Sequence, residues 1–178
     1  MHRNVKLSLL ALLASFLVAG AGIAESATTT QTVTLTINEV AEVAVTGNVS
    51  MTIDNPGTPG DDPADEMDSS TRIQYTSVVE DTDTRVVTAA ITDGLVPSGT
   101  HLELNASGET AGEGSPVPIL NLDATPKNLI TGIGSVATGS AGTEGLLLDY
   151  VWVVDSVPDL DPLESDLLTV TFTLADAA

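Results

Sequence analysis

Five acidic residues close together in the sequence are the first candidates for chemistry. Asp61, Asp62, Asp65, Glu66 and Asp68 could place several carboxylate oxygens around one Ca²⁺ ion, which takes six to eight oxygen ligands. The surrounding residues lack the D-x-[DN]-x-[DN]-G pattern of an EF-hand loop. Two interpretations therefore stand side by side, a calcium site and a solvated acidic loop. Calcium is the only cofactor that the sequence suggests.

Two aromatic residues could form a site of another kind. Tyr150 and Trp152 are separated by one residue, so they share one face if this segment is a strand. If they are exposed, the pair could stack on a sugar ring. If they are buried, they belong to the core, as does the central Trp of many β-sandwiches. The first reading would make the protein a carbohydrate- or cell-wall-binding module.

The sequence offers little for catalysis. His101 is the only histidine beyond His2, so the zinc motifs that need two imidazoles cannot form. Its neighbours Leu102 and Leu104 take the buried parity of a strand, so we expect His101 to face solvent. No G-x-S-x-G elbow is present, and 3% aromatic residues provide little for a sugar-cleaving cleft. The sequence predicts a protein that is not an enzyme.

The charge and cysteine content exclude further classes. The chain has 25 acidic and 5 basic residues, a net charge of -20 and no Cys. Such a charge repels nucleic-acid phosphates and anionic membrane surfaces, and a chain without Cys has no disulfide framework or thiolate chemistry. A very acidic surface is typical of adaptation to high salt, where the Debye length falls to about 3 Å. We therefore predict no nucleic-acid partner and consider a halophilic origin.

The first 24 residues indicate export. Arg3 and Lys6 precede an apolar run from Leu7 to Ala19, and small residues follow up to Ala24. This order of features is typical of a secretory signal peptide, and the run is shorter than the roughly 20 residues of a membrane helix. We predict a signal peptide at 1–24, cleaved after Ala24 with Ala27 as second choice, and a secreted or cell-surface protein with no stable membrane span after cleavage.

The remainder, residues 25–178, reads as one domain of short strands. Apolar and polar residues alternate with period two, which is typical of half-buried strands, and turn residues separate the segments. About nine or ten strands predict an all-β fold, an antiparallel β-sandwich of Ig-like or Greek-key type. Residues 55–70, rich in Pro, Gly and Asp, predict a flexible acidic loop. The expected strands are 30–37, 40–45, 49–53, 72–79, 85–92, 101–106, 117–122, 129–136, 146–154 and 167–174.

Strand-forming segments lie close to both ends of the expected mature chain. Thr30–Ile37 alternates Thr with Val33, Leu35 and Ile37, and 167–174 has the same alternation. A terminal strand can complete its own sheet or insert into the sheet of a neighbouring subunit by β-strand addition. Self-association, or association with other surface proteins, is therefore one of two interpretations, and an ordinary first strand is the other.

Four features of the chain can be compared with known families: the signal-like leader, the Thr-Val-Thr-Leu-Thr-Ile strand, the turn-rich short strands and the terminal Leu-Thr-Val-Thr-Phe-Thr-Leu-Ala-Asp-Ala. Together they resemble secreted bacterial surface β-sandwiches, with fimbrial and spore-coat-protein-U-like subunits nearest in organisation. The tail Thr169–Ala177 is similar to the end of WxL cell-wall-binding domains, with Phe172 at the Trp position. Chaperone–usher subunits commonly contain a disulfide, which this chain lacks.

These observations together predict an exported, non-catalytic structural or adhesive cell-surface protein, with fibre assembly by β-strand addition as one mode of action. The first alternative is a cell-wall or carbohydrate-binding module that uses Tyr150 and Trp152. The second is a calcium-dependent extracellular domain that uses the acidic residues from Asp61 to Asp68.

Overall fold

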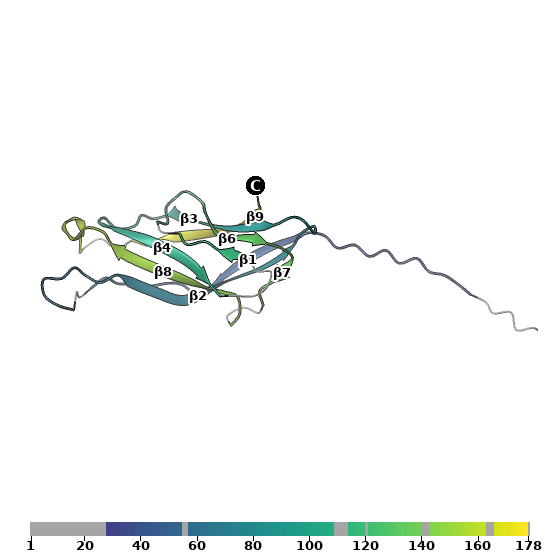
Figure 1. Cartoon of the computed structure of the whole chain (residues 1–178), viewed down its shortest axis with the longest axis horizontal. Helices are drawn as coiled ribbons and strands as arrows, with labels where there is room; N and C mark the ends of the chain where they lie inside the picture. Colours follow the sequence, from purple (N-terminus) through teal and green to yellow (C-terminus); the bar gives the residue numbers. More distant parts are fainter. Residues whose placement is uncertain are drawn as a thin grey trace, which may run out of the picture. The chain divides into compact units, whose positions relative to one another are not determined.

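The structure of the protein is a computed structural model that describes residues 28–54, 57–108, 114–119, 121–139, 143–162 and 166–177. The predicted signal peptide at 1–24 lies outside the described residues. The chain divides into two compact units, one up to Thr36 and the other from Ile37 onward. Every strand lies in the second unit (Figure 1).

The second unit is an all-β sandwich, which confirms the fold predicted from the sequence. The described residues contain no α-helix, and one short 3₁₀ turn, Val157–Asp159, follows the eighth strand. The strands are β1 (Val40–Thr46), β2 (Glu66–Val78), β3 (Arg85–Asp93), β4 (Thr100–Ser107), β5 (Ser115–Pro116), β6 (Lys127–Ile133), β7 (Val136–Ala137), β8 (Leu146–Val154) and β9 (Thr169–Asp176).

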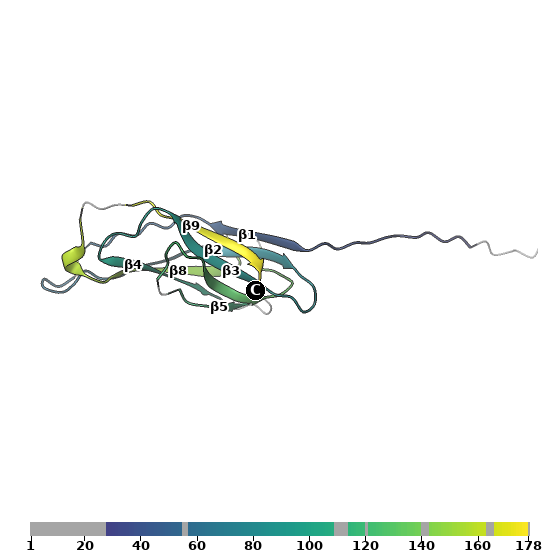
Figure 2. The ribbon, with the colours of Figure 1, turned by 90° about the horizontal axis from the view of Figure 1, so that it is seen from above.

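The strands form two antiparallel sheets that pack against each other (Figures 1 and 2). The first sheet has the order β1-β2-β8-β4, and the short β7 also pairs with β2. The second sheet has the order β5-β6-β3-β9. Strands β1 and β9, although they belong to different sheets, contact each other.

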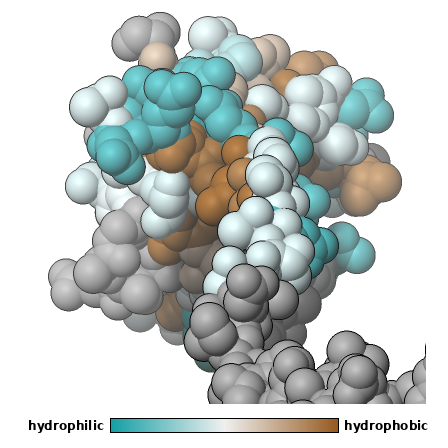
Figure 3. Space-filling model, turned by 90° about the vertical axis from the view of Figure 1, so that its right-hand side faces the viewer, coloured by the Kyte–Doolittle hydropathy of each residue, from teal (hydrophilic) through white to brown (hydrophobic). Residues whose placement is uncertain are grey.

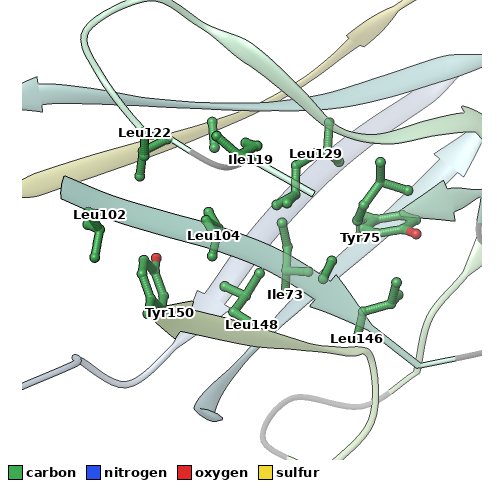
Figure 4. Close-up of a cluster of buried hydrophobic side chains, with 14 of the residues drawn as sticks. Ile73, Tyr75, Leu102, Leu104, Ile119, Leu122, Leu129, Leu146, Leu148 and Tyr150 are labelled. Carbon is green, nitrogen blue, oxygen red and sulfur yellow. The ribbon is translucent and has the colours of Figure 1, made fainter. Parts of the chain in front are cut away.

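The core lies between the sheets and follows from the alternation along strands such as β4 and β8. On β4 the buried side chains are Leu102, Leu104 and Ala106, and on β8 they are Leu146, Leu148 and Tyr150. Burying a Leu or Ile side chain contributes roughly 1.5–3 kcal/mol, so this layer of aliphatic residues stabilises the sandwich (Figure 4). Other large buried side chains include Ile73, Val87, Ile119, Leu122, Leu129, Ile130 and Ile133.

The structure differs from the predicted strands in segments whose residues alternate between apolar and polar but which have no pairing strand beside them. Residues 30–37 and 49–53 alternate, but neither segment is assigned to a strand. Alternation only shows that a segment could be a strand, since a strand forms where a neighbour supplies hydrogen bonds.

The predicted loop at 55–70 is too long, because β2 begins at Glu66. The first residues of β2, Glu66 to Asp68, pair with Trp152 to Tyr150 of β8. This pairing overrides the polar composition of the segment. Among the described residues of the expected strand at 117–122, only an isolated bridge at Ile119 forms, and the short β5 precedes this range at 115–116.

Candidate functional site

The segment Thr30–Ile37 exposes apolar side chains at every second position. Val33, Leu35 and Ile37 are 68%, 88% and 88% exposed. The stretch from Ala27 to Asn38 contains no charged residue in a chain whose net charge is -20. An uncharged, alternating segment with exposed Val, Leu and Ile has the composition of a half-buried strand but belongs to none in the structure.

One lateral side of the sandwich, formed by β4 and β5, is closed by hydrogen bonds. The backbone N–H of Leu104 donates to Ile119 O (2.8 Å), and the N–H of Ile119 donates to Leu104 O (2.7 Å). The N–H of Leu122 also donates to Leu102 O (2.7 Å). Because β5 pairs with β6 in the other sheet, residues 115–119 and 121–122 connect the two sheets along this side. Figure 4 shows the side chains of Ile119 and Leu122 together with Leu102 and Leu104 of β4.

The opposite lateral side, formed by β1 and β9, has two end strands. In the described part of the chain, β9 pairs only with β3 and β1 only with β2. The inward side chains of β9, Val170, Phe172 and Leu174, pack against the core but are only half-buried. We call the unpaired backbone of β9, on the side away from β3, its free edge. Such an edge is a template for another strand.

Hydrophobic side chains also reach the surface at the end of the molecule viewed in Figure 3, where they lie between hydrophilic ones. Contiguous exposed apolar surface on a soluble protein often marks an interaction site.

Arg85 connects the two end strands, and sequence reasoning gave it no role. Its side chain is about 5% exposed, with Nη2 2.9 Å from Glu39 Oε2 and Nε 3.0 Å from Asp176 Oδ1. Nη1 donates to the carbonyl oxygens of Val40 and Val78. Val40 is the first residue of β1, Glu39 immediately precedes it, and Asp176 is the last residue of β9. Arg85 therefore fixes both strands at one end.

The signal that could have identified Arg85 is the scarcity of basic residues. Beyond the predicted signal peptide, the chain has only Arg72, Arg85 and Lys127. In an acidic chain, a basic residue that begins a strand is a candidate partner for carboxylates of neighbouring strands.

The structure places the predicted calcium ligands in separate roles. Asp65 accepts a hydrogen bond from the backbone N–H of Val154 (2.9 Å). Asp68 accepts bonds from Ser70 Oγ (2.6 Å) and Ser70 N–H (2.8 Å), and these bonds hold its pKa below the ordinary value. Glu66 lies in β2 opposite Trp152. Asp61 and Asp62 are exposed and precede β2.

Within the described residues, no group of three His, Asp or Glu side chains could share a metal ion. Calcium binding therefore stays a prediction.

The structure brings Tyr150 and Trp152 to the inner face of β8. Tyr150 is 7% exposed, and burial, together with the nearby charge of Asp68, raises its pKa to about 12. Trp152 is half-buried, and its indole N–H donates to Thr100 Oγ1 (2.8 Å). A ring that stacks on a sugar needs an open face. The burial of Tyr150 therefore favours the core interpretation of this pair.

His101 is held between two carboxylates on the outer face of β4. Its Nδ1 lies 2.8 Å from Asp155 Oδ1, and its Nε2 lies 3.3 Å from Glu103 Oε1. The side chain lies on the outer face, as its strand parity suggested, and is partly buried there. Partial desolvation lowers the pKa of His101, but the hydrogen bonds to Asp155 and Glu103 and their charges outweigh this effect and raise it above the ordinary value. The arrangement stabilises the imidazolium form.

Comparison with known proteins finds no matching family model, no matching curated protein and no matching solved structure. Among the described residues, no helix is long and apolar enough to cross a membrane.

Proposed function

We propose that this protein is an exported, non-catalytic structural subunit of a cell surface, and that copies assemble into fibres by β-strand addition. The observation that carries the proposal is the exposure of Val33, Leu35 and Ile37 in an uncharged segment with strand alternation. An adhesive role follows if such fibres present the sandwich to other surfaces. Export rests on the predicted signal peptide at 1–24.

Burial of the segment against a sheet would provide a substantial driving force. Each Val, Leu or Ile side chain that becomes buried contributes roughly 1.5–3 kcal/mol, and eight paired residues would also satisfy the open backbone groups of an end strand. Association costs an estimated 4–15 kcal/mol in lost translational and rotational freedom. The free energy gained by burying three apolar side chains and forming a full set of strand hydrogen bonds can exceed the lower part of that cost.

The charge of the chain makes this assembly dependent on salt. Two chains of net charge -20 repel each other at low ionic strength, and the Debye length shortens from about 10 Å at 0.1 M to about 3 Å at 1 M salt. The repulsion is therefore screened at high salt, while the apolar contacts persist. We expect multimers to become more abundant as salt increases.

Size-exclusion chromatography with light scattering tests the proposal. The chain from Glu25 onward is measured from low to molar salt, beside a variant that lacks residues 25–37. We expect discrete multimers or fibres from the first protein at high salt and a folded monomer from the second.

A triple variant, Val33→Thr, Leu35→Thr and Ile37→Thr, serves as the matched control because it keeps the length, the lack of charge and the β-propensity of the segment. It should remain monomeric with an unchanged circular dichroism spectrum. The proposal is wrong if the protein is a monomer at every salt concentration, or if the triple variant multimerises as well as the parent. Destabilisation of the monomer by the deletion would instead mean that the segment belongs to its own sandwich.

A further inference from the structure

We infer that the free edge of β9 accepts the segment Thr30–Ile37 of a second copy of this chain. The inference rests on the proposed function and deepens it, because it names the accepting strand and the partner. Three features of the structure support it: the match between the two segments, the properties of the competing edge at β1, and the two-residue connection that follows Ile37.

The two segments match in length and in alternation, and they differ in charge only at Asp176, the last residue of β9, which pairs with Arg85. Thr30–Ile37 and β9 (Thr169–Asp176) each contain eight residues, and Thr alternates with apolar residues in both. The apolar residues of β9 are half-buried, so a strand added beside them would extend the apolar face of the second sheet. An added strand can form hydrogen bonds with the open N–H and C=O groups of β9 whether it runs antiparallel or parallel to β9.

The outer face of β9 already pairs threonines across strands. Thr171 Oγ1 lies 2.8 Å from Thr92 Oγ1 of β3, and Thr173 lies opposite Thr88. The threonines of the added segment would continue this row on the other side of β9, and cross-strand Thr–Thr pairs stabilise a sheet. Apolar residues would then face the core and threonines the solvent along the whole added strand.

The edge at β1 is less suitable. The burial along β1 does not alternate: Val40, Val43 and Thr46 are half-buried, whereas Val45 is exposed. The strand also carries the exposed carboxylate of Glu42. An alternating apolar segment therefore finds no continuous apolar face there, and β9 is the better acceptor.

The connection between the segment and β1 favours a second copy over self-insertion. Arg85 fixes the beginning of β1 and the end of β9 at the same end of the sandwich. To run along either strand of its own chain, the segment would have to reverse direction within Asn38–Glu39. Two-residue reversals between strands require positive φ, usually at Gly or Asn.

In the described residues, positive φ occurs only at glycines. In addition, Glu39 is held by its ion pair with Arg85. A type I′ reversal at this position would need positive φ at Glu39 as well as at Asn38, and it would put that ion pair at risk. Insertion into another chain needs no reversal between the segment and its own β1.

Insertion of this kind is head-to-tail, because donor and acceptor are different parts of the chain. Each copy offers one segment and one free edge, so every added copy leaves a new segment and a new edge available. Heterologous contacts that do not close into a ring propagate into filaments.

Engineered disulfides test the inference, and the absence of native Cys makes the result unambiguous. One preparation of the chain from Glu25 onward carries Thr34→Cys, and a second carries Thr171→Cys. The two are mixed at molar salt, oxidised and separated without reductant. We expect a heterodimeric disulfide, with Thr169→Cys and Thr173→Cys tested beside Thr171→Cys to cover neighbouring registers.

Ala44→Cys on β1 and Asn105→Cys on β4 are the matched controls for the competing edge and for the closed side. We expect the most reactive β9 position to form at least tenfold more heterodimer with Thr34→Cys than either control. Thermal melts of all single-Cys chains verify that each variant is folded.

The double variant Thr34→Cys/Thr171→Cys distinguishes insertion into another chain from self-insertion. Insertion into a second copy gives a ladder of covalent oligomers, whereas self-insertion gives an internally cross-linked monomer and overturns the inference. Preferential cross-linking to Ala44→Cys also overturns it, while multimers that depend on residues 30–37 would leave the proposed function standing. Loss of those multimers would remove both.

Discussion

The two lateral sides of the sandwich differ in how their backbone groups are used. On the β4 side, residues 115–119 and 121–122 connect the two sheets and donate hydrogen bonds to β4. On the β1 and β9 side, the end strands are tied at one end by Arg85, and the described residues add no further strand. The same chain therefore closes one side by its own connection and leaves the other open to a strand.

Core side chains are more completely buried on the side that the chain closes than on the side that it leaves open. Ile119 and Leu122 on the closed side are 3% and 1% exposed, whereas Val170, Phe172 and Leu174 on the open side stay half-buried. An added strand on the open side would give these three residues the environment that the closed side already has.

The largest expected effect comes from a matched pair of leucines. Leu122→Ala on the closed side removes a fully buried side chain and should destabilise the fold by about 2–5 kcal/mol. Leu174→Ala on the open side removes a half-buried one and should cost about 1–1.5 kcal/mol in the monomer, roughly half of a full transfer term. Urea unfolding of both variants measures the difference. Equal losses would mean that the open side is as well packed as the closed one.

The second effect concerns the ion pairs at the open side. Arg85→Met removes the charge that binds Glu39 and Asp176 and leaves the carbonyls of Val40 and Val78 without this donor. We expect a loss of about 2–3 kcal/mol, since hydrogen bonds from a buried charged group are stronger than neutral ones.

Lys127→Met is the control for Arg85→Met, because Lys127 binds Asp123 at the surface and surface ion pairs contribute little. Urea unfolding of the two variants should give a large loss for Arg85→Met and almost none for Lys127→Met. Similar losses for both would show that Arg85 acts merely as one more surface charge.

The smallest effect is a pH dependence on the closed side, where His101 lies in β4. Because its pKa is raised in the folded state, its contribution is complete below the unfolded pKa of about 6.5. It is then lost as pH rises through the folded pKa. Between pH 6 and pH 8 the parent should lose up to about 1 kcal/mol relative to His101→Gln, since the group is partly exposed. Parallel pH profiles for the two proteins would contradict this assignment.

Much of the fold could be predicted from alternation alone. β1, β3, β4 and β8 agree with the expected strands within one residue at each end. In β3, β4 and β8 the apolar pattern corresponds to buried side chains, whereas the side chains of β1 are half-buried or exposed. The early start of β2 could not be predicted, since Glu66 to Asp68 are held by pairing with β8 and not by their composition. The separate roles of Asp65 and Asp68 depend on partners distant in sequence, such as Val154.

The candidate site was predictable in part. The uncharged alternation of Thr30–Ile37 is visible in the sequence, and it indicated a strand that could belong to its own sandwich or to a neighbour's. That β9 has a free edge follows from strand order, which hairpin and crossover connections leave open. The role of Arg85 depends on the meeting of β1 and β9, two strands at opposite ends of the sequence.

The engagement of all three basic residues beyond the predicted signal peptide has a consequence for proteolysis. Arg72 Nη1 donates to Gly145 O within the first sheet, Arg85 is buried, and Lys127 binds Asn121 O and Asp123 at the start of β6. Trypsin cleaves only after Lys and Arg, and it needs several residues of unfolded backbone around the bond it cuts. In the folded chain Arg72 lies inside β2, and Arg85 and Lys127 are the first residues of β3 and β6, so cleavage at these three sites requires the strands to open. The folded domain should therefore resist trypsin-like proteases for as long as its sheets remain intact.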